Sequence, residues 1–438
     1  MTVVVRGLLW LVVYLLVVAA PLFFMLVGDP PPGRGWWMDL SLALGFIGLA
    51  MMGLQFAVTA RFHPVDAPYG LDAVLQFHRQ ITFVALVFIL AHPVILFVER
   101  PARMSMLNPL EASWMVRWGL VSVLLLVVLV VTSVWRRQLR LGYEVWRVSH
   151  GLLAIVVVAT ALIHIDMSGY YVSGPWRRGV WILMAVVLIG LLVWVRIIKP
   201  LQLLRRPYTV SEVRHVGSDV WALTVEPDGH DGLDFEPGQF AWLMVDRSPF
   251  GVREHPFSFS SSPERTDAYE FTIKELGDFT STVGQIEPGT RAYLDGPFGA
   301  FSSERRQGPG YVLIAGGVGI SPMMSMLRTM AALDDPRPVT LIYGSPSWDE
   351  VIYPDELERL TDELDLTVVH VLEHPPADWD GETGLINGEV LDRHLPARPE
   401  RRQYFICGPD PMMDAVERSL RERGISADNI NLERFEFV

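Results

Sequence analysis

The sequence predicts a multi-domain protein that consists of a six-helix transmembrane bundle, an antiparallel β-barrel and an α/β domain with a parallel sheet. A length of 438 residues exceeds that of one ordinary domain. The long apolar runs fall almost entirely before about residue 200. After residue 207, short strand-like runs separated by Gly and Pro give way, from about residue 310, to alternating strand-like and helix-like runs. We therefore expect three domains, over residues 1–202, 207–305 and 309–438.

Six apolar segments have the length that a bilayer-spanning helix requires. The first has a longer apolar run than a signal peptide and no convincing cleavage site, so we interpret it as a retained span. The segments cover approximately residues 5–27, 37–60, 72–98, 114–135, 146–166 and 177–198.

The distribution of arginine and lysine predicts the orientation of the spans. Arg136, Arg137 and Arg140 crowd the loop between the fourth and fifth spans, and Arg205 and Arg206 follow the sixth. Positive residues are enriched on the cytoplasmic side of membrane proteins. We therefore expect a protein integral to the cell (inner) membrane, with both termini and the second half of the chain in the cytoplasm.

Charge and cysteine content exclude several kinds of partner and site. The formal net charge of -13 argues against nucleic acid as a partner, because phosphate binding needs a basic surface. Cys407 is the single cysteine, which excludes intrachain disulfides, cysteine-ligated iron-sulfur clusters and cysteine-rich zinc sites. Any metal must be bound by other residue types.

Four histidines inside the predicted spans are the most informative residues of the first half. Fourteen residues separate His78 from His92 in the third span, and the same number separates His150 from His164 in the fifth. On an α-helix this spacing is a rise of about 21 Å and a rotation about 40° short of four turns, so each helix presents two imidazoles on one face. If the two helices are neighbours, His78 faces His150 and His92 faces His164.

Two stacked pairs of imidazoles predict ligands for two b-type haems, since bis-imidazole ligation is common in haems that carry electrons. Zinc fits such widely separated pairs less well. Two alternatives remain: hydrogen bonds between helices without any metal, and proton transfer in a membrane transporter or redox sensor.

The segment "HPFSFSSSP" at residues 255–263 resembles the barrel motif of ferredoxin reductase-like flavoproteins, most closely the NADPH oxidase and ferric reductase branch. The resemblance spans nearly the whole chain and implies FAD in the β-barrel. It implies that Phe257 packs against the isoalloxazine, that Ser258 lies near the flavin N5 and that His255 lies near the pyrophosphate. Pro256, between His255 and Phe257 in the sequence, belongs to the same motif. The segment "IKELGDFTSTV" at 273–283 resembles the family's second flavin element, with an ordinary capped helix as the alternative. The residues that match this element are Lys274, Gly277, Thr280 and Ser281.

Two further segments resemble the family's nicotinamide-binding elements. "AGGVGISP" at 315–322 lies between a predicted strand and a predicted helix, which is the context of a dinucleotide phosphate loop. Cys407, in "CGPDPMM", is implied to lie near the nicotinamide, with a merely buried cysteine as the alternative. Phe435 or Phe437 is implied to cover the flavin. The remaining matched residues are Gly316, Gly317, Gly319, Ser321, Pro322, Gly408 and Pro409.

The family resemblance implies an NAD(P)H oxidase or ferric reductase-type enzyme. Electrons would pass from NADPH or NADH to FAD, then to the two haems, and then to an acceptor outside. We expect O2, giving superoxide, as the first choice, then ferric chelates, then a partner protein. Because "YGSPSWDEVIY" at 343–353 lacks the arginine or lysine of NADPH-selective relatives, we expect NADH or dual use.

Overall fold

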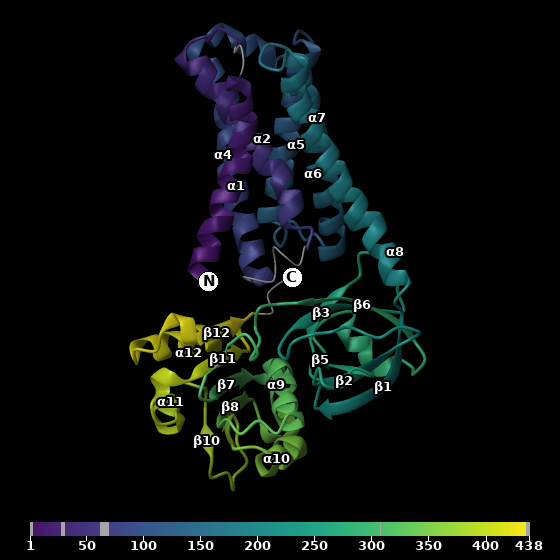
Figure 1. Cartoon of the computed structure of the whole chain (residues 1–438), viewed down its shortest axis with the longest axis vertical. Coiled ribbons are helices and arrows are strands. Elements are labelled where there is room, and N and C mark those ends of the chain that lie inside the picture. The colour runs from purple at the N-terminus through teal and green to yellow at the C-terminus, as the bar shows by residue number, and fades with distance from the viewer. Residues whose placement is uncertain (1–2, 28–30, 62–69, 307, 435–438) are drawn as a thin grey trace. The chain divides into compact units, whose positions relative to one another are not determined.

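The computed structural model describes residues 3–27, 31–61, 70–306 and 308–434, in two compact units, one ending at Pro200 and the other beginning at Leu201 (Figure 1). In this part of the chain six helices are long and apolar enough to cross a membrane, which confirms the predicted bundle. They are α1 (Val3–Leu26), α2 (Trp36–Val58), α4 (Leu71–Glu99), α5 (Trp114–Val134), α6 (Tyr143–Ser168) and α7 (Pro175–Val193). A π-helical turn, η2 (Trp194–Ile198), joins α7 to α8 (Lys199–Leu204).

Within the first unit the helices pack chiefly in two pairs, α2 with α4 and α5 with α6. An apolar cluster that includes Phe46 and Leu49 of α2, Val158 of α6 and Trp181 of α7 holds the bundle together. Many Leu and Val side chains of α1, α5 and α7 are exposed instead. An apolar exposed surface is what helices in contact with lipid require.

The second unit begins with a six-stranded antiparallel sheet in the order β4-β3-β6-β1-β2-β5. The sheet curls into a half-barrel. An isolated antiparallel bridge pairs Phe259, directly after β4, with Phe271 of β5. Phe235, Phe259 and Tyr269 fill its interior. The strands are β1 (Tyr208–Gly217), β2 (Val220–Pro227), β3 (Phe240–Val245), β4 (His255–Ser258), β5 (Tyr269–Lys274) and β6 (Arg291–Phe298).

A parallel six-stranded sheet in the order β10-β9-β8-β7-β11-β12 completes the second unit. One apolar cluster packs α9 and α10 on one face of the sheet, and another packs α11 and α12 on the opposite face. The strands are β7 (Tyr311–Gly316), β8 (Val339–Ser345), β9 (Leu366–Leu372), β10 (Glu382–Thr383), β11 (Gln403–Cys407) and β12 (Ile430–Glu433); the helices are α9 (Ile320–Ala332), α10 (Pro354–Glu363), α11 (Gly388–His394) and α12 (Asp410–Glu422).

Candidate functional site

The four membrane histidines form two facing pairs between α4 and α6. The ring centroids of His78 and His150 lie 6.4 Å apart, and those of His92 and His164 lie 6.4 Å apart as well. A metal bound at about 2.0 Å by one nitrogen of each ring, with about 1.1 Å from nitrogen to ring centre, separates two centroids by roughly 6.2 Å. Both pairs therefore have the separation that a single metal ion between two imidazoles requires.

Helix α2 orients the two histidines of α4 through their Nδ1 atoms. Nδ1 of His78 lies 2.9 Å from the carbonyl-type Oε1 of Gln55. Nδ1 of His92 lies 2.9 Å from Oγ of Ser41 and 3.0 Å from the Ser41 carbonyl oxygen. A carbonyl oxygen only accepts hydrogen bonds, so in both rings Nδ1 carries the proton. Nε2 then keeps its lone pair for a metal.

Helix α5 orients the two histidines of α6 in the same way. Nδ1 of His164 donates to the Met115 carbonyl oxygen at 2.8 Å. Nδ1 of His150 lies 3.0 Å from Oγ of Ser133, whose own proton goes to the Leu129 carbonyl at 2.7 Å. That hydroxyl oxygen therefore accepts from His150, and all four rings have the tautomer that leaves Nε2 available.

Two glycines allow the supporting helices to approach the rings of one pair. A Cβ on Gly45 of α2 would lie 3.3 Å from Cγ of His92, and one on Gly119 of α5 would lie 2.9 Å from Nδ1 of His164. A side chain at Gly119 would overlap the imidazole of His164, and one at Gly45 would crowd that of His92. The pair formed by His92 and His164 is therefore closely enclosed from behind.

Sequence reasoning missed these supporting residues, although a signal for them exists. Ser41 and Gln55 are polar residues in a largely apolar span and are buried in the structure. They are fourteen residues apart, like the histidines they contact, and the same spacing separates Gly119 from Ser133. A search for matched fourteen-residue spacings in all spans would have found them.

The predicted flavin motif lies on β4, at the edge of the curled sheet. The ring of His255 stacks on Phe279 with centroids 4.4 Å apart and an interplanar angle of 3°, and Phe257 contacts the same ring at 6.2 Å. Pro256, between them, pairs with Trp242 of β3. The Ser258 hydroxyl is 3% exposed and has no hydrogen-bond partner among the residues that the structure describes. Because buried hydroxyls are normally bonded, this group is available to a bound ligand.

The second flavin element follows β5 and contains a short helix. This helix is the 3-10 helix η3 (Thr280–Gln285), and the Glu287–Thr290 turn follows it. Oγ1 of Thr280 accepts from the backbone N–H groups of Leu276 and Gly277, both at 2.8 Å. Lys274 forms an ion pair with Asp219 at 3.3 Å, and the Ser281 hydroxyl donates to the Asp278 carbonyl at 3.2 Å. The structure thus uses the Thr280 and Ser281 hydroxyls to form the turn itself.

The predicted phosphate loop connects β7 to α9, as its sequence context indicates. Gly317 has φ +52°, in the left-handed region that favours glycine. A Cβ on Gly319 would lie 2.2 Å from the Cys407 carbonyl oxygen, and one on Gly316 would lie 2.9 Å from Cδ of Pro409. The loop is therefore packed directly against the Cys407–Gly408–Pro409 backbone, which follows the neighbouring strand β11.

Several other predicted residues can now be located. Cys407 is fully buried at the end of β11, and Gly408 has φ +157° next to Gly316. Ser321 and Pro322 are buried in the first turn of α9, where the Ser321 hydroxyl donates to the Thr272 carbonyl at 3.3 Å. Phe435 and Phe437 lie outside the described residues.

Three family models match consecutive parts of the chain. Residues 44–161 match "Ferric reductase like transmembrane component", residues 205–301 match "FAD-binding domain", and residues 313–418 match "Oxidoreductase NAD-binding domain". The first match includes three of the four membrane histidines, His78, His92 and His150. The other two cover the curled sheet and most of the parallel-sheet domain.

Curated relatives match about half of the chain or somewhat less. The reductase component of propane 2-monooxygenase from Mycolicibacterium smegmatis is 31% identical over 235 residues, which cover 52% of this chain and 66% of that protein. NADH-cytochrome b5 reductase 2 of Scheffersomyces stipitis is 30% identical over 193 residues, covering 40% of this chain and 65% of that protein. The chain thus spans just under two thirds of the length of these relatives.

Among solved structures, the ferredoxin reductase of carbazole 1,9a-dioxygenase is 26% identical, with a TM-score of 0.47, over 52% of this chain and 69% of that one. The assignment of the three domains rests on the matches to the family models. They give the domain content of an NAD(P)H-dependent flavin oxidoreductase joined to a membrane component. With a ferric reductase-like transmembrane domain, an FAD-binding domain and an NAD-binding domain in one chain, the protein has the architecture of the ferric reductase and NADPH oxidase type of flavocytochrome.

Proposed function

We propose that this protein transfers electrons from NAD(P)H, through FAD and two b-type haems, to an acceptor on the opposite side of a membrane. The observation that carries the proposal is the geometry of the histidines. Two pairs of rings have centroids 6.4 Å apart, and every Nδ1 is engaged by the helix behind it.

The donor set of each pair fits haem better than zinc. Structural and catalytic zinc sites use three or four protein ligands. Among the described residues no cluster of three or more His, Cys, Asp or Glu side chains could hold a metal. Two opposed imidazoles suit a metal whose other ligands belong to a macrocycle, and such a haem supplies one-electron transfer. His78 and His150 would hold one haem, and His92 and His164 the other.

The residues proposed to bind FAD are those of the two flavin elements. FAD converts the two-electron chemistry of a nicotinamide into one-electron steps. Phe257 offers a ring to the isoalloxazine, and Ser258 offers a buried hydroxyl that has no other partner in the described chain. His255 is already fixed by stacking on Phe279. We also assign Pro256, Lys274, Gly277, Thr280 and Ser281 to this site.

The phosphate loop and the Cys407 segment are proposed to bind NAD(P)H. Gly316, Gly317 and Gly319 let the loop approach a pyrophosphate, with Ser321 and Pro322 starting the helix that follows. Cys407, with Gly408 and Pro409, would lie near the nicotinamide, and Phe435 or Phe437 would cover the flavin. Since no arginine or lysine lies within residues 343–353, we propose NADH or dual use. The Ser347 hydroxyl there donates to Glu350 at 3.4 Å.

The order of the haems follows from the path of the chain within the bundle. His78 and His150 lie near the beginnings of α4 and α6, and α7 ends at the same side because it runs in the opposite direction to α6. The chain therefore leaves the bundle at the end that holds His78 and His150. We propose that this pair receives electrons from FAD on the cytoplasmic side. His92 and His164 would then pass them outward.

We propose O2, reduced to superoxide, as the acceptor, with ferric chelates second and a partner protein third. The connection between α4 and α5 contains a short 3-10 helix, η1 (Pro101–Leu107), and an ion pair between Arg103 and Glu99 at 3.0 Å. Neither provides the carboxylate cluster that ferric iron would favour. A small neutral acceptor agrees best with this surface.

Acceptor choice can be tested on the purified, haem-loaded and FAD-loaded protein in sealed vesicles. We expect reduction by NADH under argon, and then re-oxidation by air with superoxide appearing on the side opposite to the nucleotide. Superoxide is detected with a membrane-impermeant probe. Re-oxidation by a ferric chelate but not by air would instead identify a ferric reductase.

The role of His164 predicts a specific effect of Gly119→Val. A valine would overlap the imidazole, since even its Cβ would lie 2.9 Å from Nδ1. We expect haem content relative to FAD to fall by about half, with the other haem retained. Gly190→Val in α7 is the matched control, because nothing lies within 4 Å of its added Cβ. Full haem content in Gly119→Val would argue against His164 as a ligand.

The phosphate loop predicts that Gly319→Ala impairs nucleotide use selectively. Its Cβ would lie 2.2 Å from the Cys407 carbonyl oxygen, and such overpacking costs about 1–3 kcal/mol. We expect KM for NADH to rise about tenfold or more in a flavin reduction assay. Reduction by dithionite should be unchanged, because FAD binding is preserved. An unchanged KM would contradict the assignment of this loop.

A further inference from the structure

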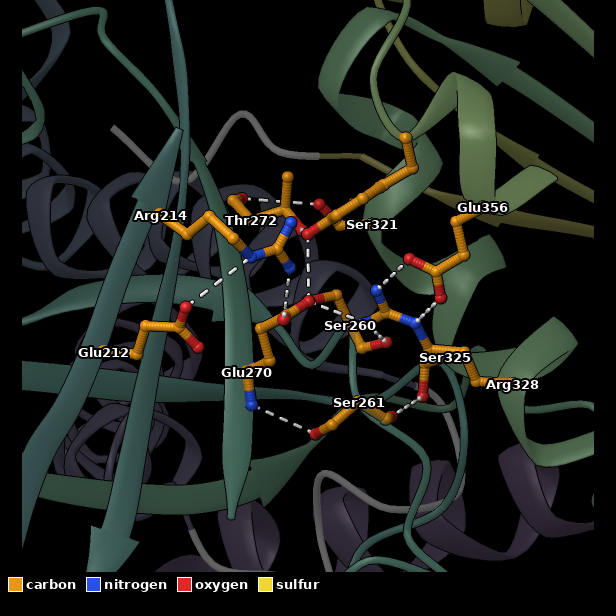
Figure 2. A network of polar contacts seen from close by, with 11 residues as sticks. Glu212, Arg214, Ser260, Ser261, Glu270, Thr272, Ser321, Ser325, Arg328 and Glu356 are labelled. Atoms are coloured by element: carbon orange, nitrogen blue, oxygen red, sulfur yellow. Dashed lines mark hydrogen bonds and ion pairs between the residues drawn. The ribbon is translucent and has the colours of Figure 1, made fainter. Parts of the chain in front are cut away.

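Helix α9 presents one polar face to the flavin-binding sheet. Ser321, Ser325 and Arg328 are spaced by four and three residues, so they lie on the same side of the helix. Ser321 and Ser325 are 2% and 0% exposed. We call these three residues the α9 seam. Figure 2 shows their side chains directed toward Ser260, Ser261, Glu270 and Thr272 of the curled-sheet domain.

The two serines of the seam contact both flavin-binding segments close to their predicted ligands. The Ser325 hydroxyl donates to the Ser261 carbonyl at 2.7 Å, three residues after Ser258. The Ser321 hydroxyl donates to the Thr272 carbonyl at 3.3 Å, two residues before Lys274. The helix that begins at the phosphate loop is therefore hydrogen-bonded to the ends of both flavin elements.

Arg328 adds the strongest contact. Its guanidinium donates to the Ser260 carbonyl at 2.7 Å and to Oε1 of Glu270 at 2.6 Å. Two further bonds, of 2.7 and 2.8 Å, go to the carboxylate of Glu356 on α10. The side chain is only 16% exposed. One planar guanidinium thus joins α9, α10 and the flavin domain, a geometry that lysine cannot reproduce.

Glu270 is the flavin-domain partner of this arginine, and it is well satisfied. Burial would raise the pKa of its carboxyl, but Arg328, Tyr353 and Ser260 together hold that pKa below its ordinary value. The Tyr353 hydroxyl lies 2.9 Å from Glu270 and 2.8 Å from Oγ1 of Thr272. Arg214 approaches the other carboxylate oxygen at 3.3 Å. The carboxylate is therefore ionised, and its charge is balanced.

Apolar packing reinforces the same contact. Val220 and Ala222 of β2 belong to one buried cluster with Ile352 and Tyr353 of the nucleotide domain. Domains joined by a polar contact alone usually move relative to each other. Here an apolar cluster surrounds a buried charge network, so the two domains are held in a fixed relation.

We propose that the α9 seam positions bound NAD(P)H against the flavin for hydride transfer, with Arg328 as the main positioning residue. In that step the C4–H bond of the nicotinamide breaks, and its hydrogen and electron pair move to the flavin, which also takes one proton from solvent. The dinucleotide is oxidised and FAD is reduced. The inference rests on the proposed function, since both ligands must bind where we assign them. A misplacement of about 1 Å can cost on the order of 100-fold in rate.

The test compares Arg328→Gln with Arg423→Gln in the full-length, FAD-loaded protein. Arg423 is a matched control: it is 23% exposed, pairs with Asp392 and donates to two backbone carbonyls, all inside the nucleotide domain. Flavin reduction by NADH is followed anaerobically by stopped flow. We expect Arg328→Gln to lower the limiting rate constant about tenfold or more. The dissociation constant for NADH and the FAD content should change less than twofold.

Two further measurements separate positioning from simple loss of structure. With NADH deuterated at C4, we expect a larger isotope effect in Arg328→Gln, because hydride transfer becomes slower relative to binding. Arg328→Lys should recover part of the rate. Ser325→Ala removes one hydrogen bond without burying an unpaired charge, and we expect a reduction of about threefold. This variant decides the question if Arg328→Gln does not retain FAD.

The proposal is overturned if Arg328→Gln and Ser325→Ala reduce flavin at the wild-type rate, or if their rates fall only in proportion to FAD content. Equal losses in Arg423→Gln would also overturn it. If neither NADH nor NADPH reduces the wild-type flavin, the proposed function itself fails, and the seam proposal fails with it. That result is distinguishable because it appears before any substitution is made.

Discussion

Each membrane histidine donates a hydrogen bond from Nδ1 to the helix behind it, and the arrangement of the bundle depends on this constraint. A polar ring inside a bilayer is costly unless it has partners. Gln55 and Ser41 of α2 provide them for His78 and His92, and α5 provides them for the other two. This explains why α2 packs with α4 and α5 with α6. The same hydrogen bonds therefore pair the helices and leave the Nε2 atom of each ring available to a metal.

The second unit depends on a comparable constraint, the close approach of backbone segments. The phosphate loop touches the Cys407 segment so tightly that a Cβ on Gly319 would overlap the Cys407 carbonyl. The helix that follows the loop is joined to the curled sheet by buried hydroxyls and by the Arg328 guanidinium. Loop, helix and flavin elements therefore form one framework. In such a framework the distance between two bound cofactors is set by packing and not by a flexible linker.

Much of this organisation could be predicted from the sequence, because it follows from local patterns. The length of the apolar runs predicted six spans, and the fourteen-residue spacing predicted that His78 would face His150 and His92 would face His164, as their rings do. The phosphate loop lies between a strand and a helix, as its glycines indicated. These features depend on helix periodicity and on turn chemistry, which neighbouring residues determine.

The features that were missed depend on contacts between distant segments. His164 donates its hydrogen bond to the backbone carbonyl of Met115. Every residue has such a carbonyl, so the residue type at position 115 does not predict this bond. Arg328 and Glu270 are ordinary charged residues in sequence, and only the docking of two domains buries them together.

The most direct test of the proposed path of electrons is an anaerobic optical titration of the purified protein with NADH and NADPH, with haem and FAD both quantified. The proposed path of electrons predicts about two b-type haems for each FAD, with low-spin bis-imidazole spectra. It also predicts that both haems are reduced after the flavin when nucleotide is added. Protein that binds FAD but no haem, or haem that stays oxidised while the flavin is reduced, would contradict the proposed path of electrons.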